Sequence, residues 1–263
     1  MPDILDLQGR NALVTGAGQG VGRQIVMHFA DHNAGGIVIN DYYQERANTV
    51  AKELKEAGVK CRLIPIGADV TKHDDVQRMV DTARAQLDGP IHILVNNAGN
   101  SGSAGLGQSR FVETSPDFWE PWIRVNLYGV LNCSHAVLPG MINANYGKIV
   151  TVISDAARVP ERQLAVYGAA KAGAAAFMRC LAGEVGRHNI TCNCVALGTT
   201  RTPTSESVWQ DEKVFGAVLK LYLLPRLGEP TDAANMILFL SSDASSWITG
   251  QTYPVNGGYS VTL

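Results

Sequence analysis

The sequence has no excess of charge of either sign. Its 22 Lys and Arg residues are scattered among 24 Asp and Glu residues, which gives a formal net charge of −2. A nucleic-acid-binding surface needs basic residues gathered in a patch or stripe. The composition therefore argues against nucleic acid as a partner.

The chain also lacks a long hydrophobic run and a basic leader. Its first residues, MPDILDLQGR, carry acids where a secretory signal peptide carries basic residues. No apolar run is long enough to cross a bilayer. We therefore expect a cytoplasmic protein without a membrane partner.

Cysteine is scarce and dispersed. The five cysteines are Cys61, Cys133, Cys180, Cys192 and Cys194. An odd, scattered set fits reduced thiols in apolar segments better than a disulfide framework. Neither the cysteines nor the six histidines show metal-ligand spacing, so we predict no metal site.

What the sequence has in plenty is alternation between strand-like and helix-like segments. The expected strands span 11–16, 36–41, 61–70, 91–99, 147–154, 190–197 and 252–258. The expected helices span 20–34, 44–57, 73–88, 117–144, 165–188 and 231–241. This order predicts an α/β protein, with one Rossmann-type, doubly wound parallel sheet of about seven strands and helices on both faces. The length suits a single domain over residues 1–263.

Two segments interrupt the alternation, at 100–110 and 199–230. Both leave the carboxyl end of an expected strand, which is where ligands bind in open α/β sheets. We expect them to form the walls of a substrate pocket, with 199–230 as its lid.

A glycine-rich turn, TGAGQGVG, joins the first strand to the first helix. Glycines at such a bend let the backbone approach a pyrophosphate, which the helix N-terminus attracts. The residues of this turn expected to bind the cofactor are Gly16, Gln19, Gly20, Val21 and Gly22.

The second strand ends in Asp41, which is placed to accept hydrogen bonds from the adenosine ribose. A carboxylate there repels the 2′-phosphate of NADP, and neighbouring Tyr42 and Gln19 offer no cation, so we predict NAD. Asp69 and Val70 are expected beside the adenine ring, although Asp69 could equally cap the helix that starts near Thr71.

The stretch AVYGAAKAG places Tyr167 and Lys171 four residues apart, on one face of a helix. A phenol that acts as a base near neutral pH needs a pKa about 3 below its usual value near 10. Lys171 and a positive nicotinamide are neighbours that would lower it. Ser154 suits hydrogen bonding to the substrate oxygen better than proton transfer.

The motifs T-G-x-x-x-G-x-G, Asn96-Asn97-Ala98-Gly99, Ser154 and Tyr167-x-x-x-Lys171 together resemble the short-chain dehydrogenase/reductase family over nearly the whole chain. The resemblance implies that Tyr167 is the general acid/base, that Lys171 assists it, and that Ser154 holds the substrate oxygen. Lys171 could also bond the nicotinamide ribose. Asn126 would hold a water in the proton relay. The remaining residues implied to contact the cofactor are Asn97, Ala98, Gly99, Tyr167, Gly198, Thr200 and Thr202.

The resemblance also implies a homotetramer, formed through the helices near 117–144 and 165–188 and the C-terminal Gly-Gly region. One departure from the family pattern is Leu197, which stands where a proline is usual. Proline fixes φ and lacks a backbone donor, so we expect Leu197 to loosen the cofactor lip slightly.

The sequence indicates an NAD-dependent oxidoreductase of a secondary alcohol and its ketone. Arg158, Arg162 and Arg201 could together meet the phosphates of an alicyclic or 3-hydroxyacyl-CoA thioester. The alternatives are free cyclic, steroid or sugar alcohols, a short-chain epimerase or dehydratase, and a catalytically silent NAD-binding scaffold. Asn145 and His188 stand where carrier-protein reductases place arginines, which disfavours a carrier-protein partner.

Overall fold

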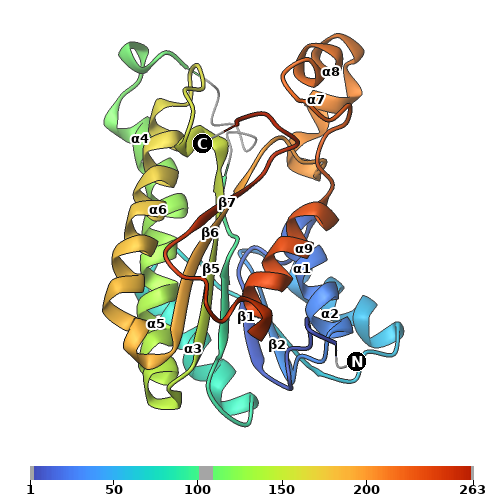
Figure 1. The fold of residues 1–263 in the computed structure, drawn as a ribbon, viewed down its shortest axis with the longest axis vertical. Coiled ribbons are helices and arrows are strands. Elements are labelled where there is room, and N and C mark those ends of the chain that lie inside the picture. The colour runs from blue at the N-terminus through green and yellow to red at the C-terminus, as the bar shows by residue number, and fades with distance from the viewer. Residues whose placement is uncertain (1–2, 101–108, 262–263) are drawn as a thin grey trace.

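The computed structural model describes residues 3–100 and 109–261, and its core is one parallel sheet (Figure 1). Seven strands lie in the order β3-β2-β1-β4-β5-β6-β7, so the doubly wound fold is confirmed. The strands are β1 Asn11–Val14, β2 Gly36–Asp41, β3 Arg62–Gly67, β4 Ile93–Asn96, β5 Gly147–Ser154, β6 Ile190–Leu197 and β7 Thr252–Val255.

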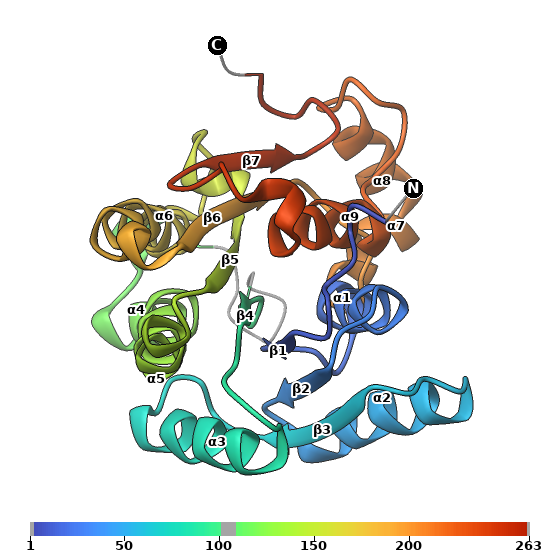
Figure 2. The ribbon, with the colours of Figure 1, turned by 60° about the horizontal axis from the view of Figure 1, so that its bottom comes forward.

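Helices cover both faces of the sheet. They are α1 Gly20–Asp31, α2 Gln44–Glu56, α3 His73–Gln86, α4 Pro116–Ile123, α5 Gly129–Ala144, α6 Ala165–Val185, α7 Glu206–Gln210, α8 Glu212–Leu219 and α9 Pro230–Ser241. Figure 2 shows α4, α5 and α6 on one side of the sheet and α1 and α9 on the other.

The sheet separates two hydrophobic cores. In β1, Leu13 packs into the core beneath α3, α5 and α6, whereas Ala12 and Val14 pack into the core beneath α1, α2 and α9. Successive side chains of a strand point to opposite faces. This is why the central strands are apolar at nearly every position.

Several expected elements end early or are interrupted. The third and fourth strands stop at Gly67 and Asn96, three residues before their expected ends. A π turn, Arg124–Tyr128, separates α4 from α5 within the helix expected over 117–144. The segment 199–230 contains α7 and α8, which stand at the carboxyl edge of the sheet (Figure 1).

All five cysteines are free thiols. Cys133, Cys192 and Cys194 are buried, but Cys180 is exposed, so the expectation of an apolar environment is wrong there. Within residues 3–100 and 109–261, no group of three or more His, Cys, Asp or Glu residues could hold a metal. In the same ranges, no helix is long and apolar enough to span a membrane.

Candidate active site

The glycine-rich turn, residues 15–22, forms a glycine cradle in which Gly16, Gly20 and Gly22 cannot readily be replaced by a residue with a side chain. Gly16 and Gly20 have φ of 61° and 54°, which favours glycine. A Cβ on Gly22 would lie 2.2 Å from Gly16 O. Val21 is buried in the first turn of α1, after Gln19 at the N-cap. The backbone amides of this turn lie at the N-terminus of α1, a position that fits a dinucleotide pyrophosphate.

Thr15 and Asn97 hold this turn from behind. Thr15 Oγ1 accepts hydrogen bonds from the backbone amides of Asn97 and Ala98, each at 3.0 Å. Asn97 Nδ2 donates to Thr15 O at 2.9 Å and to Gly16 O at 3.0 Å. Asn97 therefore supports the cradle with its side chain. Sequence reasoning missed Thr15 as a site residue, although its place before the first glycine was a signal.

Asp41 lies at the carboxyl end of β2 and is almost fully buried. Its Oδ2 accepts from Gly18 N at 3.1 Å, and its Oδ1 accepts from Tyr43 N at 3.0 Å. A cation that sequence reasoning missed is close by. A Cβ on Gly18 would lie 2.5 Å from Arg46 Cβ, and the Arg46 guanidinium lies 4.6 Å from the Tyr43 ring centroid.

Asp69 and Val70 follow β3. Asp69 Oδ1 accepts from Thr71 N at 3.0 Å and from Thr71 Oγ1 at 2.7 Å, whereas the N-cap of α3 is Lys72. The helix-cap alternative for Asp69 is therefore wrong, because its carboxylate closes a local turn. Val70 is buried against α5, where a Cβ on Gly129 would lie 2.9 Å from its Cγ2.

Tyr167 and Lys171 lie on the buried face of α6, as their spacing predicts. Lys171 Nζ donates to Val152 O in β5 at 2.8 Å. A Cβ on Gly99 would lie 3.1 Å from Lys171 Nζ and 2.9 Å from Asn126 Oδ1. The loop after β4, the lysine and Asn126 therefore meet at this glycine.

Burial dominates the electrostatics of this pair. It raises the pKa of Tyr167 to about 12, with Glu161 adding to the rise and the Ser154 side chain opposing it. Burial also lowers the pKa of Lys171 to about 8. The lowering of the phenol pKa expected from Lys171 together with a positive nicotinamide therefore stays a prediction. At neutral pH the phenol keeps its proton and can donate it.

Ser154 is the last residue of β5 and lies opposite Leu197 in the β5–β6 register. Its Oγ accepts from Ala156 N at 3.2 Å, which caps the short 3-10 turn Asp155–Ala157. A Cβ on Gly168 would lie 2.6 Å from Ala156 O, so α6 packs tightly against this turn. That contact brings Ser154 to Tyr167.

Asn126 is fully buried within the π turn. Its Nδ2 donates to Asn100 Oδ1 at 2.8 Å and to Trp122 O at 3.0 Å, and its Oδ1 accepts from Asn100 N at 3.3 Å. Single π turns inside α-helices are frequent at functional sites. Here the turn directs Asn126 into the loop after β4, and its role in holding a water stays a prediction.

The segment after β6 returns to the glycine cradle. A Cβ on Gly20 would lie 3.2 Å from Thr202 Cγ2. Thr200 Oγ1 donates to Gly198 O at 3.2 Å, and a Cβ on Gly198 would lie 3.0 Å from Tyr222 Cε1. The structure thus brings Gly198, Thr200 and Thr202 to the same edge as the cradle.

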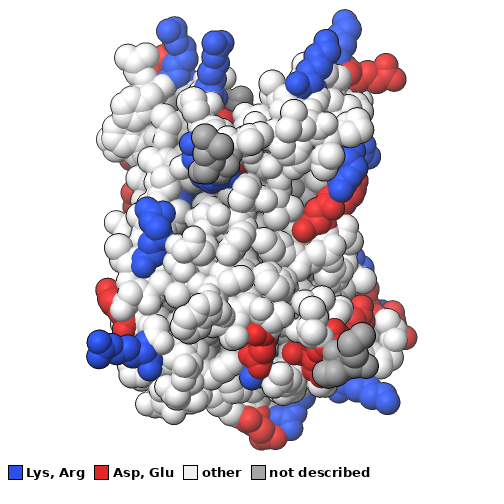
Figure 3. Space-filling model, in the orientation of Figure 1, with Lys and Arg blue, Asp and Glu red and all other residues white. Residues whose placement is uncertain are grey.

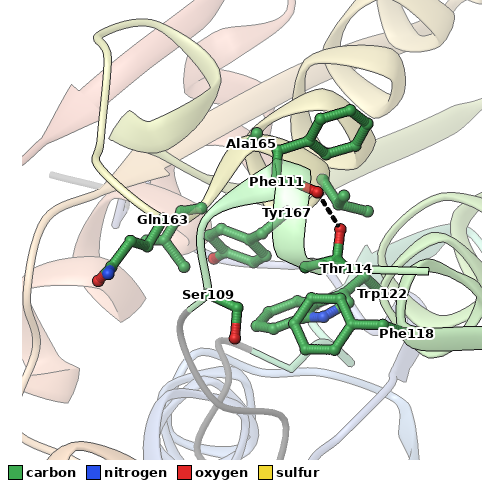
Figure 4. A pocket seen from close by; sticks show the side chains of 10 residues that line it. Ser109, Phe111, Thr114, Phe118, Trp122, Gln163, Ala165 and Tyr167 are labelled. Atoms are coloured by element: carbon green, nitrogen blue, oxygen red, sulfur yellow. Dashed lines mark hydrogen bonds between the residues drawn. The ribbon is translucent and has the colours of Figure 1, made fainter.

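An aromatic pocket lies beside Tyr167 (Figure 4). The Trp122 ring meets the Tyr167 ring edge-on, and their centroids are 5.6 Å apart. The centroids of the Phe118 and Trp122 rings are 6.2 Å apart. The lining residues are Ser109, Phe111, Thr114, Phe118, Trp122, Gln163, Leu164, Ala165, Val166 and Tyr167. Sequence reasoning missed Phe118 and Trp122, for which the run FWEPW was the available signal. The expected wall at 100–110 contributes Ser109, and its residues 101–108 lie outside the described ranges.

The three arginines expected at the pocket mouth have separate environments. Arg158 Nη1 donates to Asp155 Oδ1 at 3.0 Å. Arg201 Nε lies 3.5 Å from Glu229 Oε1, and its guanidinium lies 5.5 Å from the Phe215 ring centroid. Arg162 is exposed. Figure 3 shows Lys and Arg residues dispersed over the face in view, among large areas without charge.

Comparison with known proteins gives consistent matches over almost the whole chain. A family model described as enoyl-(acyl carrier protein) reductase matches residues 16–260. The 2,3-dihydro-2,3-dihydroxybenzoate dehydrogenase of Bacillus subtilis (strain 168) is 36% identical over 261 residues, covering 96% of each chain.

Two further matches extend the comparison. The (2S)-[(R)-hydroxy(phenyl)methyl]succinyl-CoA dehydrogenase subunit BbsD of Thauera aromatica is 36% identical over 257 residues, covering 98% of this chain and 99% of its own. A solved 7α-hydroxysteroid dehydrogenase, complexed with NADH and 7-oxo glycochenodeoxycholic acid, superposes with a TM-score of 0.90 at 32% identity. That match covers 98% of this chain and 97% of the other.

Proposed function

The chain belongs to the short-chain dehydrogenase/reductase family and is a nicotinamide-dependent oxidoreductase acting on CH–OH groups, and we propose that it uses NAD to interconvert a secondary alcohol and a ketone. The observation that carries the proposal is the convergence of Ser154, Tyr167 and Lys171 at the carboxyl edge of the sheet, beside a glycine cradle.

In this proposal Ser154 donates a hydrogen bond to the substrate oxygen. Tyr167 gives its proton to the ketone oxygen during reduction and takes the proton from the alcohol during oxidation. A nicotinamide held beside Tyr167 and Lys171 would supply the hydride in reduction and accept it in oxidation. The buried ammonium of Lys171 stabilises the phenolate that forms when Tyr167 releases its proton.

The proposed cofactor site runs along the carboxyl edge. Asp41 would bind the adenosine ribose, and Lys171 would bind the nicotinamide ribose. The other residues proposed to line the site are Gly16, Gln19, Gly20, Val21, Gly22, Asp69, Val70, Asn97, Ala98, Gly99, Tyr167, Gly198, Thr200 and Thr202.

NAD is favoured because Asp41 ends β2, where a carboxylate would repel the 2′-phosphate of NADP. Its two backbone hydrogen bonds hold that negative charge in place. NADP is the second candidate, because Arg46 lies close to Gly18 at the same position. Binding of NADH and NADPH to the same preparation, measured by fluorescence titration, distinguishes the two.

The substrate is proposed to carry a ring. Seven of the ten side chains that line the pocket beside Tyr167 are aromatic or aliphatic, which suits an alicyclic or aromatic group. A free cyclic alcohol is favoured over a CoA thioester, because Arg158 and Arg201 already meet Asp155 and Glu229. Residues 199–230 are proposed to close over the substrate as a lid.

Assembly and location complete the proposal. The family resemblance supports a homotetramer, and the sequence supports a single-domain subunit in the cytoplasm. A silent NAD-binding scaffold would need no buried phenol and amine, so the pair argues against that alternative.

The proposal is tested by assaying NADH formation and consumption with cyclic alcohols, steroids, sugar alcohols and hydroxyacyl-CoA thioesters. Tyr167→Phe should lower kcat on the active substrate by about 10²- to 10⁴-fold, because it removes the general acid/base. Tyr128→Phe, which alters an exposed tyrosine, is the matched control and should retain full turnover. Wild-type turnover in Tyr167→Phe would contradict the mechanism.

A further inference from the structure

Asp155, the residue that follows Ser154, is a fully buried carboxylate. Its Oδ1 accepts hydrogen bonds from Arg158 Nη1 and Ser260 Oγ, each at 3.0 Å. Its Oδ2 accepts from Asn256 Nδ2 at 2.7 Å. Two of these donors come from the C-terminal segment, about a hundred positions further along the chain.

The hydrogen bonds around this carboxylate are consistent with one another. Ser260 Oγ donates its proton to Asp155 and accepts from Arg158 Nη1 at 3.3 Å and from Asn256 Nδ2 at 2.9 Å. Asn256 Oδ1 in turn accepts from Gly258 N at 3.0 Å. A buried carboxylate is costly unless donors surround it, so this segment is needed to keep Asp155 in place.

The C-terminal segment, residues 256–260, also contacts the lid segment 199–230. Gly257 O accepts from the backbone amides of Leu223 and Leu224, each at 3.0 Å. The Tyr259 and Tyr222 rings lie 5.3 Å apart. Tyr222 in turn accepts a hydrogen bond at its hydroxyl from Thr199 N at 2.7 Å, at the start of the lid.

Two glycines make this double attachment possible. Gly257 and Gly258 have φ of 58° and 82°, a backbone conformation that favours glycine. A Cβ on Gly258 would lie 2.7 Å from Leu223 Cβ. The segment therefore turns tightly between the catalytic strand and the lid.

We propose that residues 256–260 form a C-terminal clasp that positions the catalytic serine: Ser260 and Asn256 fix Asp155, and Asp155 fixes the Ser154 hydroxyl relative to the lid. The inference rests on the proposed oxidoreductase function. Ser260 and Asp155 are positioning residues, because they act on the substrate oxygen through Ser154. The clasp also joins Leu223 and Leu224 of the lid segment to Asp155 at the end of β5. Closing of the lid over the substrate is therefore coupled to the position of Ser154.

The first test is a double-mutant cycle between Ser260→Ala and Ser154→Ala. Alone, Ser260→Ala should lower kcat about tenfold and leave the NADH dissociation constant within about twofold, because it removes a donor to a buried charge. In the Ser154→Ala background it should have less than about a twofold effect, since the two changes act through one group. Multiplicative effects would overturn the proposal.

Three controls separate positioning from folding. Ser260→Thr keeps a hydroxyl and should restore most of the turnover, and Ser246→Ala changes an exposed serine and should behave as wild type. Titration with NADH counts the folded sites, so kcat is expressed per binding site. A loss explained entirely by fewer sites would contradict a positioning role.

The second test is independent of turnover. Hydrogen exchange at the amides of Ala156, which bonds Ser154 Oγ, and of Leu223 and Leu224, which bond Gly257 O, should be at least about tenfold faster in Ser260→Ala. Unchanged exchange at these amides would overturn the clasp, even if no substrate were turned over. Failure of the proposed function would appear instead as equal turnover by wild type and Tyr167→Phe.

Discussion

At the scale of single residues, Lys171 shows how the site combines charge with burial. Only 4% of its surface is exposed, and its ammonium has a backbone carbonyl as its hydrogen-bond acceptor. Burial without a counter-charge lowers the pKa of a lysine, and here the value falls from 10.5 to about 8. At neutral pH the buried ammonium of Lys171 is therefore charged in the folded protein, and this charge lowers the free energy of unfolding.

Lys171→Met should show this cost. Between about pH 8 and pH 10.5 the unfolded chain binds more protons at this lysine than the folded chain, so this lysine makes wild-type stability rise with pH across that window. At pH 7 the Met variant should be about 1–3 kcal/mol more stable, and this gain should shrink toward pH 10. Urea unfolding at the two pH values measures it. Lys60→Met, at an exposed lysine, is the control, and a destabilised Lys171→Met would contradict the argument.

Asp41 and Arg46 give opposite preferences at the ribose. Asp41→Asn keeps the shape of the side chain and removes its charge, so it should reduce the preference for NADH over NADPH by roughly tenfold. Arg46→Ala added to Asp41→Asn should abolish the improvement in NADPH binding. Fluorescence titration of both cofactors measures the change. A wild type that prefers NADPH would show that Arg46 outweighs Asp41.

At the scale of elements, small residues decide how closely α6 packs against the turn after β5 and against the π turn before α5. Gly168 and Gly173 face Ala156 O and the Leu127 side chain, at 2.6 Å and 3.4 Å from where a Cβ would stand. The sequence did not predict the π turn before α5, where Asn126 bonds Asn100, 26 positions earlier, because no local pattern shows that contact.

Two helical glycines, Gly22 in α1 and Gly183 in α6, offer a direct comparison. Gly22→Ala places a methyl group 2.2 Å from Gly16 O and should displace the cradle, so NADH affinity should fall at least about tenfold. Gly183→Ala lies in the interior of α6 with open space around its Cβ, and should raise stability by about 0.5–1 kcal/mol. Titration and urea unfolding of both variants check this. Equal NADH affinity in Gly22→Ala and wild type would contradict the assignment of the cradle.

At the scale of the whole molecule, the most exposed aromatic side chain points to assembly. Trp247 precedes β7, the edge strand of the sheet, and 99% of its surface is exposed. Leu223 and Leu224 are also exposed, and they bond to the C-terminal segment nearby. Exposed apolar groups mark association surfaces, so Trp247 before β7 and the two leucines beside Gly257 support the homotetramer proposed from the family resemblance.

The oligomer prediction is a molar mass near four times 28.2 kDa, measured by light scattering during size-exclusion chromatography. Trp247→Glu should shift the population toward smaller species, because it places a charge in the proposed interface. Ile4→Glu, at another exposed apolar residue, should leave the mass unchanged. A wild-type monomer at micromolar concentration would exclude the tetramer.

The sequence alone determined the order of strands and helices, the glycine cradle at Gly16–Gly22, and the shared face of Tyr167 and Lys171. These features depend on local periodicity and spacing, which any reader of the chain can follow. The tertiary structure decided the direction of the Tyr167 pKa, because that direction depends on how deeply α6 is buried. It also decided that Asp155 is surrounded by donors from Arg158 and the C-terminal segment, since no local pattern relates residues a hundred positions apart.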